Sequence, residues 1–326
     1  MTRPDRQYLA LALRSAVREA IWLASCDHEQ GEKPNILLFA ARRGGSTFAM
    51  ELIGANRGVR TLDQPFSTIS RYVSSVQLAH IPRFHQGQIT SVDPVTHDRL
   101  SEMVSQMFSG RAVVNAPTKF WRRGTTWRSN RLVLKITDAK PVIDWFDRQI
   151  AADIVYVSRH PIPQALSCLR NGWSLTVDAH LRDPVFVDRY LPDAAVPFAH
   201  DTMRGGTDLQ RFILNWIVEN VAPLRHLPDR PTWTHVRYED CVVSPERTIE
   251  LLAQRLDLSD VDRMQRVVSR PSASSKLSTE ATRRQISAGH GAALVTRWRE
   301  DVTPDDELWC NRALEIFEID HRLLLP

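Results

Sequence analysis

Short apolar runs alternate along the chain with longer segments in which apolar residues recur every three or four positions. The runs are rich in Val, Ile, Leu and Phe, a composition that favours buried strands. The predicted strands are residues 35–40, 59–62, 131–136, 153–157 and 232–236. The predicted helices are residues 47–56, 97–108, 141–150, 161–170, 208–224, 245–256 and 305–316.

Continuous apolar strands separated by helices predict a parallel sheet that is covered by helices on both faces. The expected fold class is therefore α/β, with a single domain built on a central parallel sheet. Ligands of such sheets bind beyond the carboxyl ends of the strands. Two stretches without the pattern, residues 63–94 and 181–206, are predicted to be irregular; they form either walls of a binding site or plain surface excursions.

The N-terminal stretch, residues 8–23, is rich in Leu and Ala but is interrupted by Arg14, Arg18 and Glu19. It is too charged for a signal-peptide core and too short to span a bilayer. We expect an amphipathic helix packed on the body of the protein, with docking on a membrane surface as the alternative. Residues 1–30 are thus predicted to be an N-terminal helical extension and residues 31–326 one domain.

The composition is that of a water-soluble globular protein, with 43% hydrophobic and 25% charged residues. The net charge of +4 is mild, and acids and bases are mixed along the chain, so no nucleic-acid partner is predicted. The four cysteines form no CxxC pair and have no accompanying histidine cluster. This pattern argues against a disulfide framework or a zinc site and favours a cytoplasmic location.

The strongest local signal is the segment LLFAARRGGSTFAME, residues 37–51. An apolar strand ends there, Gly44 and Gly45 turn the chain, and Ser46 and Thr47 open a helix. Glycine lets backbone amides approach an anion closely, and the first helical amides have no partner within the helix. A helix N-terminus stabilises an anion by roughly 0.3–2 kcal/mol. The segment predicts a site for a phosphate or sulfate ester, the alternative being a helix merely capped by Ser46.

The segment differs from the loop that binds nucleoside triphosphates, which requires GxxxxGK[ST]. Here Gly45 precedes the hydroxyl residue, and the cations lie upstream at Arg42 and Arg43. No predicted strand ends convincingly in a magnesium-binding Asp. These differences argue against a P-loop kinase or another nucleotide phosphotransferase, which is retained as an alternative function.

The order of residues in this loop resembles the 5′-phosphosulfate loop of sulfotransferases that use 3′-phosphoadenosine 5′-phosphosulfate (PAPS). The matching residues are Arg43, Gly44, Gly45, Ser46, Thr47 and Phe48, with Arg42 preceding them. A second match follows the strand 153–157, where Arg159 and Ser167 have the spacing of the family's 3′-phosphate element. Pro161 suits the first turn of the intervening helix.

Two further matches are shorter. Tyr238 begins a Tyr-Glu-Asp segment like the one whose Tyr lies against adenine in the family, although a buried structural Tyr is the alternative. Arg297 and Trp298 lie in residues 287–301, which resemble the basic segment that closes over the nucleotide, in a register that the sequence does not fix.

The resemblance implies a P-loop-kinase-like sulfotransferase fold, PAPS as co-substrate and no metal. It implies in-line transfer of a sulfuryl group to a hydroxyl or amine of a small-molecule, glycan or lipid acceptor. Arg43 would neutralise charge on the leaving phosphate, and Lys135, at the end of the strand 131–136, would contact the reacting group; a surface Lys is the alternative. No sequence pattern selects an acceptor or an oligomeric state.

The general base is the point at which the chain departs from the family. Thr137 stands where relatives have His, and Gln64 stands where others have Glu before Pro. Asp63, next to Gln64, is the predicted base. The alternatives are Asp138, His80, His85 and no protein base at all. Loss of the usual base also leaves open a catalytically inactive nucleotide-binding protein.

Overall fold

The computed structural model describes residues 17, 27–66, 88–110, 126–268 and 295–324. Most of the predicted extension 1–30 lies outside the described residues, as do His80 and His85. A five-stranded sheet, parallel throughout, has the order β3-β5-β2-β6-β7. The strands are β2 (Asn35–Ala40), β3 (Val59–Asp63), β5 (Arg131–Ile136), β6 (Ala152–Ser158) and β7 (Thr234–Arg237).

The first of these five strands, β2, lies in the middle of the sheet, and counted along the chain the order is 2-3-1-4-5. This is the P-loop-kinase-like α/β arrangement that the sequence predicts. A short parallel pair of strands, β1 (Asp27–His28) and β4 (Arg128–Ser129), lies apart from the main sheet.

Alternation of side chains across β2 explains why the sheet needs helices on both faces. Ile36, Leu38 and Ala40 belong to one buried apolar cluster, whereas Leu37 and Phe39 belong to the other. Successive residues of a strand point to opposite faces, so a strand that is apolar at every position must be covered twice.

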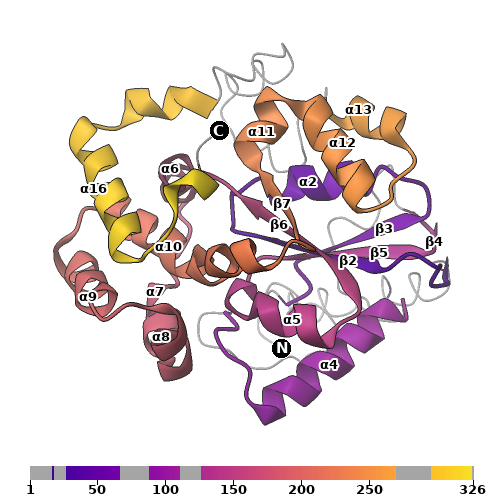
Figure 1. Cartoon of the computed structure of the whole chain (residues 1–326), viewed down its shortest axis with the longest axis horizontal. Coiled ribbons are helices and arrows are strands. Elements are labelled where there is room, and N and C mark those ends of the chain that lie inside the picture. Colours follow the sequence, from indigo (N-terminus) through magenta and orange to yellow (C-terminus); the bar gives the residue numbers. More distant parts are fainter. Residues whose placement is uncertain (1–16, 18–26, 67–87, 111–125, 269–294, 325–326) are drawn as a thin grey trace, which may run out of the picture.

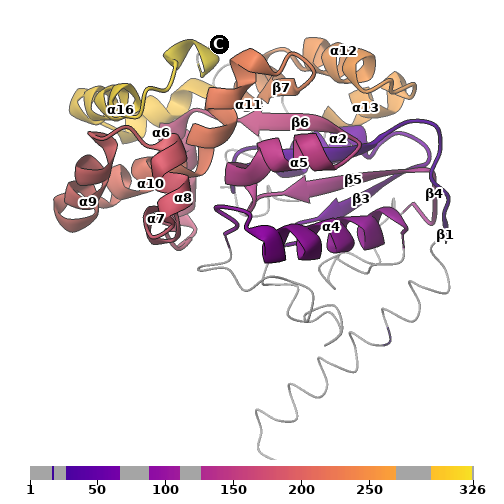
Figure 2. The same cartoon turned by 60° about the horizontal axis from the view of Figure 1, so that its bottom comes forward.

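Two helical layers provide this cover (Figures 1 and 2). One consists of α2 (Ser46–Ile53), α11 (Tyr238–Val243), α12 (Pro245–Arg255) and α13 (Val261–Val268). The helices of the other cluster include α4 (Pro94–Phe108), α5 (Ile143–Gln149), α6 (Pro161–Arg170), α10 (Asp208–His226) and α16 (Pro304–Ile316). Helix α2 follows β2 and helix α6 follows β6, so both helices begin at the carboxyl ends of the strands.

The prediction that residues 181–206 are irregular is wrong, because they contain α8 (Pro184–Tyr190) and α9 (Ala195–Gly205). Pro184 occupies the first position of α8, where proline is well tolerated, and the Asp183 carboxylate caps the helix by accepting from two backbone amides. Pro184, which indicates a break in the sequence, thus marks the start of a helix. A short α7 (Val177–Leu181) precedes this pair.

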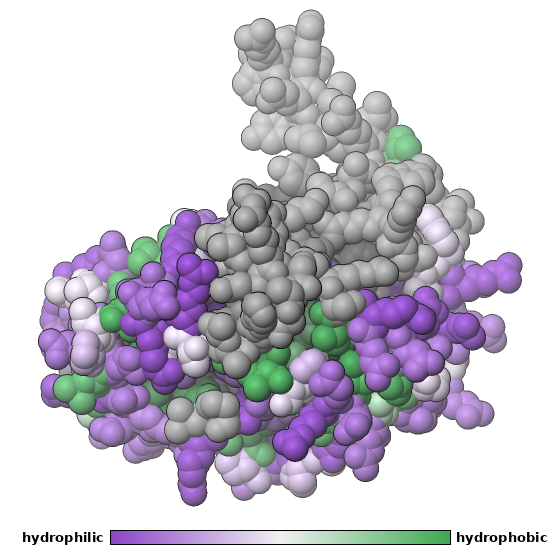
Figure 3. Space-filling model, turned by 90° about the horizontal axis from the view of Figure 1, so that it is seen from above, coloured by the Kyte–Doolittle hydropathy of each residue, from purple (hydrophilic) through white to green (hydrophobic). Residues whose placement is uncertain are grey.

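The predicted helix 141–150 also differs from the structure, in which a 3₁₀ turn, η4 (Lys140–Val142), is followed by α5. Among the residues that the structure describes, no helix has the length and apolarity needed to cross a membrane. The face of the molecule in Figure 3 is largely hydrophilic where its residues are described, with smaller hydrophobic patches between them.

Candidate active site

The loop between β2 and α2 is held in a conformation that requires glycine. The Gly44 amide donates to the Ala41 carbonyl at 3.0 Å, and Gly45 has a left-handed backbone with φ of 90°. A Cβ on Gly45 would overlap the ring of Tyr238 at Cδ2. The loop therefore depends on Gly45 both for its backbone angle and for the close approach of Tyr238.

The first turn of α2 follows directly. The N-cap residue is Gly45, and no side chain caps the helix, so Ser46 is the first helical residue rather than the cap. Arg43 also has a positive φ of 62°. Turns of this kind direct backbone amides toward a common point and form anion-binding concavities. The geometry suits the predicted anion site.

Lys135 and Asp63 meet at the carboxyl edge of the sheet because the register of β3 and β5 pairs these two residues. Lys135 Nζ lies 2.5 Å from Asp63 Oδ1 and donates to Thr47 Oγ1 at 3.3 Å. Both charged side chains are only 4% exposed. Burial lowers the pKa of Lys135 to about 8, against the opposing effects of Glu51 and Asp138. The predicted catalytic Lys and base thus lie side by side, beside the phosphate loop.

The second predicted motif joins the first. Arg43 Nε donates to Ser167 Oγ at 3.0 Å, and Arg159 Nη1 donates to the Arg43 carbonyl at 3.0 Å. The Arg159 guanidinium lies 4.7 Å from the centre of the Tyr238 ring. Burial, together with the adjacent Arg159 charge, lowers the pKa of Arg43. Two like charges in a partly buried space are stabilised by a bound anion.

The remaining predicted residues are more scattered. Trp298 is 8% exposed and stacks on His160, with ring centres 4.8 Å apart, and so lies beside the start of α6. Arg297 is half exposed, and its nearest described acidic partner is Glu300 at 4.0 Å. Phe48 packs against the apolar cluster under α12 and α13. Of these three, Trp298 is the one for which the structure gives a contact with a residue that follows β6.

Arg42 takes a place that the sequence does not predict. Its guanidinium donates to Glu219 Oε1 at 3.2 Å and to the Ser174 carbonyl at 3.3 Å, and it lies over the Trp173 ring. Arg42 therefore forms an ion pair with a residue of α10, whereas its neighbour Arg43 donates a hydrogen bond to Ser167. The two adjacent cations therefore have different partners.

Sequence reasoning missed Glu219 and Lys140, both of which are buried and ion-paired to each other at 3.1 Å. A signal was available in the segment WIVENVA, where an acidic residue interrupts an apolar stretch of a helix. Asp138, an alternative base, is also buried, and burial raises its pKa to about 6. Within the described part of the chain, its Oδ1 has no hydrogen-bond partner.

Comparisons with known proteins find the resemblance in structure rather than in sequence. No family model matches the chain. No curated protein matches it either. Similar solved structures include the sulfotransferase domain from the curacin biosynthetic pathway, which is 13% identical with a TM-score of 0.46 over 90% of this chain and 99% of that chain.

A mouse sulfotransferase complexed with adenosine 3′,5′-bisphosphate (PAP) is 12% identical, with a TM-score of 0.44 over 93% of this chain and 90% of that chain. The sulfotransferase domain from the Synechococcus olefin synthase is 15% identical, with a TM-score of 0.43 over 91% of this chain and 98% of that chain. All three are sulfotransferases or sulfotransferase domains. At these identities and TM-scores the likeness carries no argument about function, and the case for function rests on the residues of the site.

Proposed function

We propose that the protein is a sulfotransferase that moves a sulfuryl group from PAPS to a hydroxyl or amine of a small-molecule, glycan or lipid acceptor. The observation that carries the proposal is the meeting of two predicted phosphate motifs. Arg43 of the loop after β2 contacts Ser167 of α6, and Arg159 contacts the same loop. The buried Lys135–Asp63 pair lies at the neighbouring strand ends.

In this proposal the loop amides, Arg43 and Thr47 hold the 5′-phosphate of the nucleotide, and Arg159 with Ser167 holds the 3′-phosphate. Tyr238, beside the loop, contributes the adenine contact. Trp298 and Arg297 close over the nucleotide. The site needs no metal, because cations and backbone amides supply the charge stabilisation.

The reaction forms one bond to sulfur and breaks another. The acceptor oxygen or nitrogen attacks sulfur in line with the bond to the 5′-phosphate, which leaves as adenosine 3′,5′-bisphosphate (PAP). The acceptor proton passes to the Asp63 carboxylate. Lys135, adjacent to both Asp63 and Thr47, stabilises charge on the transferring group and on the leaving oxygen.

A cytoplasmic location belongs to the same proposal. Cys168, Cys241 and Cys310 are buried free thiols, which is the usual state of cysteines in a reducing compartment.

The first test is nucleotide binding. Arg43→Ala and Arg159→Ala are each expected to weaken PAP binding about 10- to 100-fold, the size of one lost charge-assisted contact. Isothermal titration calorimetry measures the affinities. Arg322→Ala is the matched control, since Arg322 pairs only with Asp320 in an exposed turn among the described residues. Wild-type affinity in both site variants would refute the assignment of the two phosphate sites.

The second test concerns the base. Asp63→Asn is expected to lower turnover about 10²- to 10⁴-fold, because the amide cannot accept the acceptor proton, while PAP affinity is kept. Transfer is measured with labelled PAPS and a panel of phenols, sugars and lipids. Asp201→Asn, which alters an exposed pair with Arg204, is the control. An unchanged rate in Asp63→Asn would exclude Asp63 as the base.

A further inference from the structure

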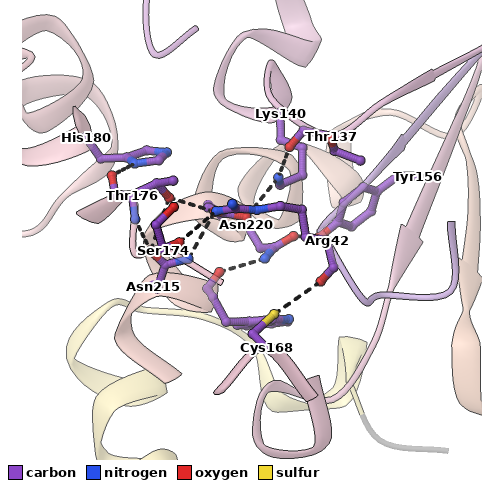
Figure 4. A network of polar contacts seen from close by, with 12 residues as sticks. Arg42, Thr137, Lys140, Tyr156, Cys168, Ser174, Thr176, His180, Asn215 and Asn220 are labelled. Carbon is purple, nitrogen blue, oxygen red and sulfur yellow. Dashed lines mark hydrogen bonds and ion pairs between the residues drawn. The ribbon is translucent and has the colours of Figure 1, made fainter. Parts of the chain in front are cut away.

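A second cluster of buried charges lies behind the phosphate loop, on the side that faces α10. Its centre is Glu219, which is 2% exposed and accepts from Arg42 at 3.2 Å and from Lys140 at 3.1 Å. Thr176 Oγ1 donates to the same carboxylate at 2.7 Å, and Asn215 Nδ2 donates at 3.0 Å. Figure 4 shows Arg42, Lys140, Thr176 and Asn215 pointing into this one network.

The network keeps Glu219 charged. Burial opposes ionisation of the carboxyl, but Lys140, Arg42 and the Thr176 hydroxyl outweigh it and hold the pKa of Glu219 well below its usual range. Lys140 is completely buried, and its ammonium also donates to the Thr137 carbonyl at 2.6 Å. Removal of the carboxylate would therefore leave buried cations without compensation, which is strongly unfavourable.

The two cations come from the two loops that carry the candidate site. Arg42 directly precedes Arg43 and the glycine pair in the loop after β2. Lys140 begins η4, the turn that follows β5, and Lys135 is the next-to-last residue of β5. Strands β2 and β5 are neighbours, so their following loops lie side by side. One carboxylate on α10 thus links the phosphate loop to the turn behind the catalytic Lys.

We propose that Glu219 is a positioning residue, which holds these two loops in the relative placement that the nucleotide requires by binding Arg42 and Lys140 together. Replacement of a buried ion pair by apolar residues is often neutral for stability, so stability alone does not account for a network of this size. Positioning accounts for its location. The inference rests on the proposed function, because it names what holds the PAPS site.

The test is a double-mutant cycle on PAP affinity with the full chain. Glu219→Gln keeps the size of the side chain and removes its charge, and Arg42→Gln removes one of the cations. Each variant is expected to weaken PAP binding about tenfold or more. The double variant is expected to bind PAP no more weakly than the weaker-binding of the two single variants, because the two substitutions act through one contact. Glu318→Gln, which alters an exposed pair with Arg225, is the control and is expected to bind as the wild type does.

The outcomes separate positioning from a general loss of stability. Additive losses in the cycle, or wild-type affinity in folded Glu219→Gln, would overturn the proposal and leave the proposed function intact. A wild-type protein that binds no PAP would overturn both. Should Glu219→Gln fail to fold, the Arg42→Gln and Lys140→Gln pair gives the same cycle: non-additive losses support the positioning role, and additive losses contradict it.

Discussion

Replacing Lys135 by Met is expected to lower kcat for sulfuryl transfer by about 10²- to 10³-fold, the usual cost of removing one donor from a developing negative charge. Lys135 is buried at the strand end, 2.5 Å from Asp63 and 3.3 Å from Thr47, beside the phosphate loop. Single-turnover measurements with labelled PAPS report the chemical step. Lys33→Met, which changes a half-exposed Lys paired with Asp257, is the control.

The pH dependence of kcat/KM tests the role of Lys135 independently. With its pKa lowered to about 8 by burial, Lys135 is charged below pH 8 and loses its charge as the pH rises above it. We therefore expect kcat/KM, which reports the free enzyme, to decline as the pH rises through about 8. Lys135→Arg should keep its charge and lack this decline. A decline that persists unchanged in Lys135→Arg would assign it to another group.

Gly45→Ala is expected to reduce PAP affinity by about 100-fold or more, because the added methyl displaces the Tyr238 ring and with it the Arg159 guanidinium that lies on the ring. The left-handed backbone at position 45 adds about 1–2 kcal/mol of strain for any residue with a Cβ. Calorimetry with PAP and thermal unfolding together measure both effects.

Gly172→Ala is the matched control, since Gly172 also has a positive φ, of 62°, but a Cβ there meets nothing within 4 Å. Both variants should lose stability, and only Gly45→Ala should lose nucleotide binding. Equal PAP affinity in the two variants would contradict the role of Tyr238 as a wall of the site.

The sheet is the part of the fold that follows most directly from the sequence. The ends of β2 and β5 agree with prediction because Ile, Leu, Val and Phe form most of both strands. Residues 181–206 were harder, because proline indicates a break in a sequence but also occupies the first turn of a helix. Only a capping residue such as Asp183 separates these meanings.

The arrangement of the candidate-site residues was predictable where local spacing determines geometry. Arg159 precedes α6 and Ser167 lies within it, and both contact Arg43. The ends of parallel strands bring Lys135 beside Asp63. The separate directions of Arg42 and Arg43 could not be predicted, because two adjacent arginines are equivalent until a tertiary partner distinguishes them. That partner, Glu219, lies 177 positions away along the chain.

The contact between Gly45 and Tyr238 joins the earliest strand of the main sheet to the last one, since Tyr238 follows β7 immediately. During synthesis, the glycine loop therefore emerges long before the ring that completes its wall. Under the proposed function, a nascent chain that ends before β7 carries the loop but lacks Tyr238, so the nucleotide gains its full binding site only after β7 has joined the sheet.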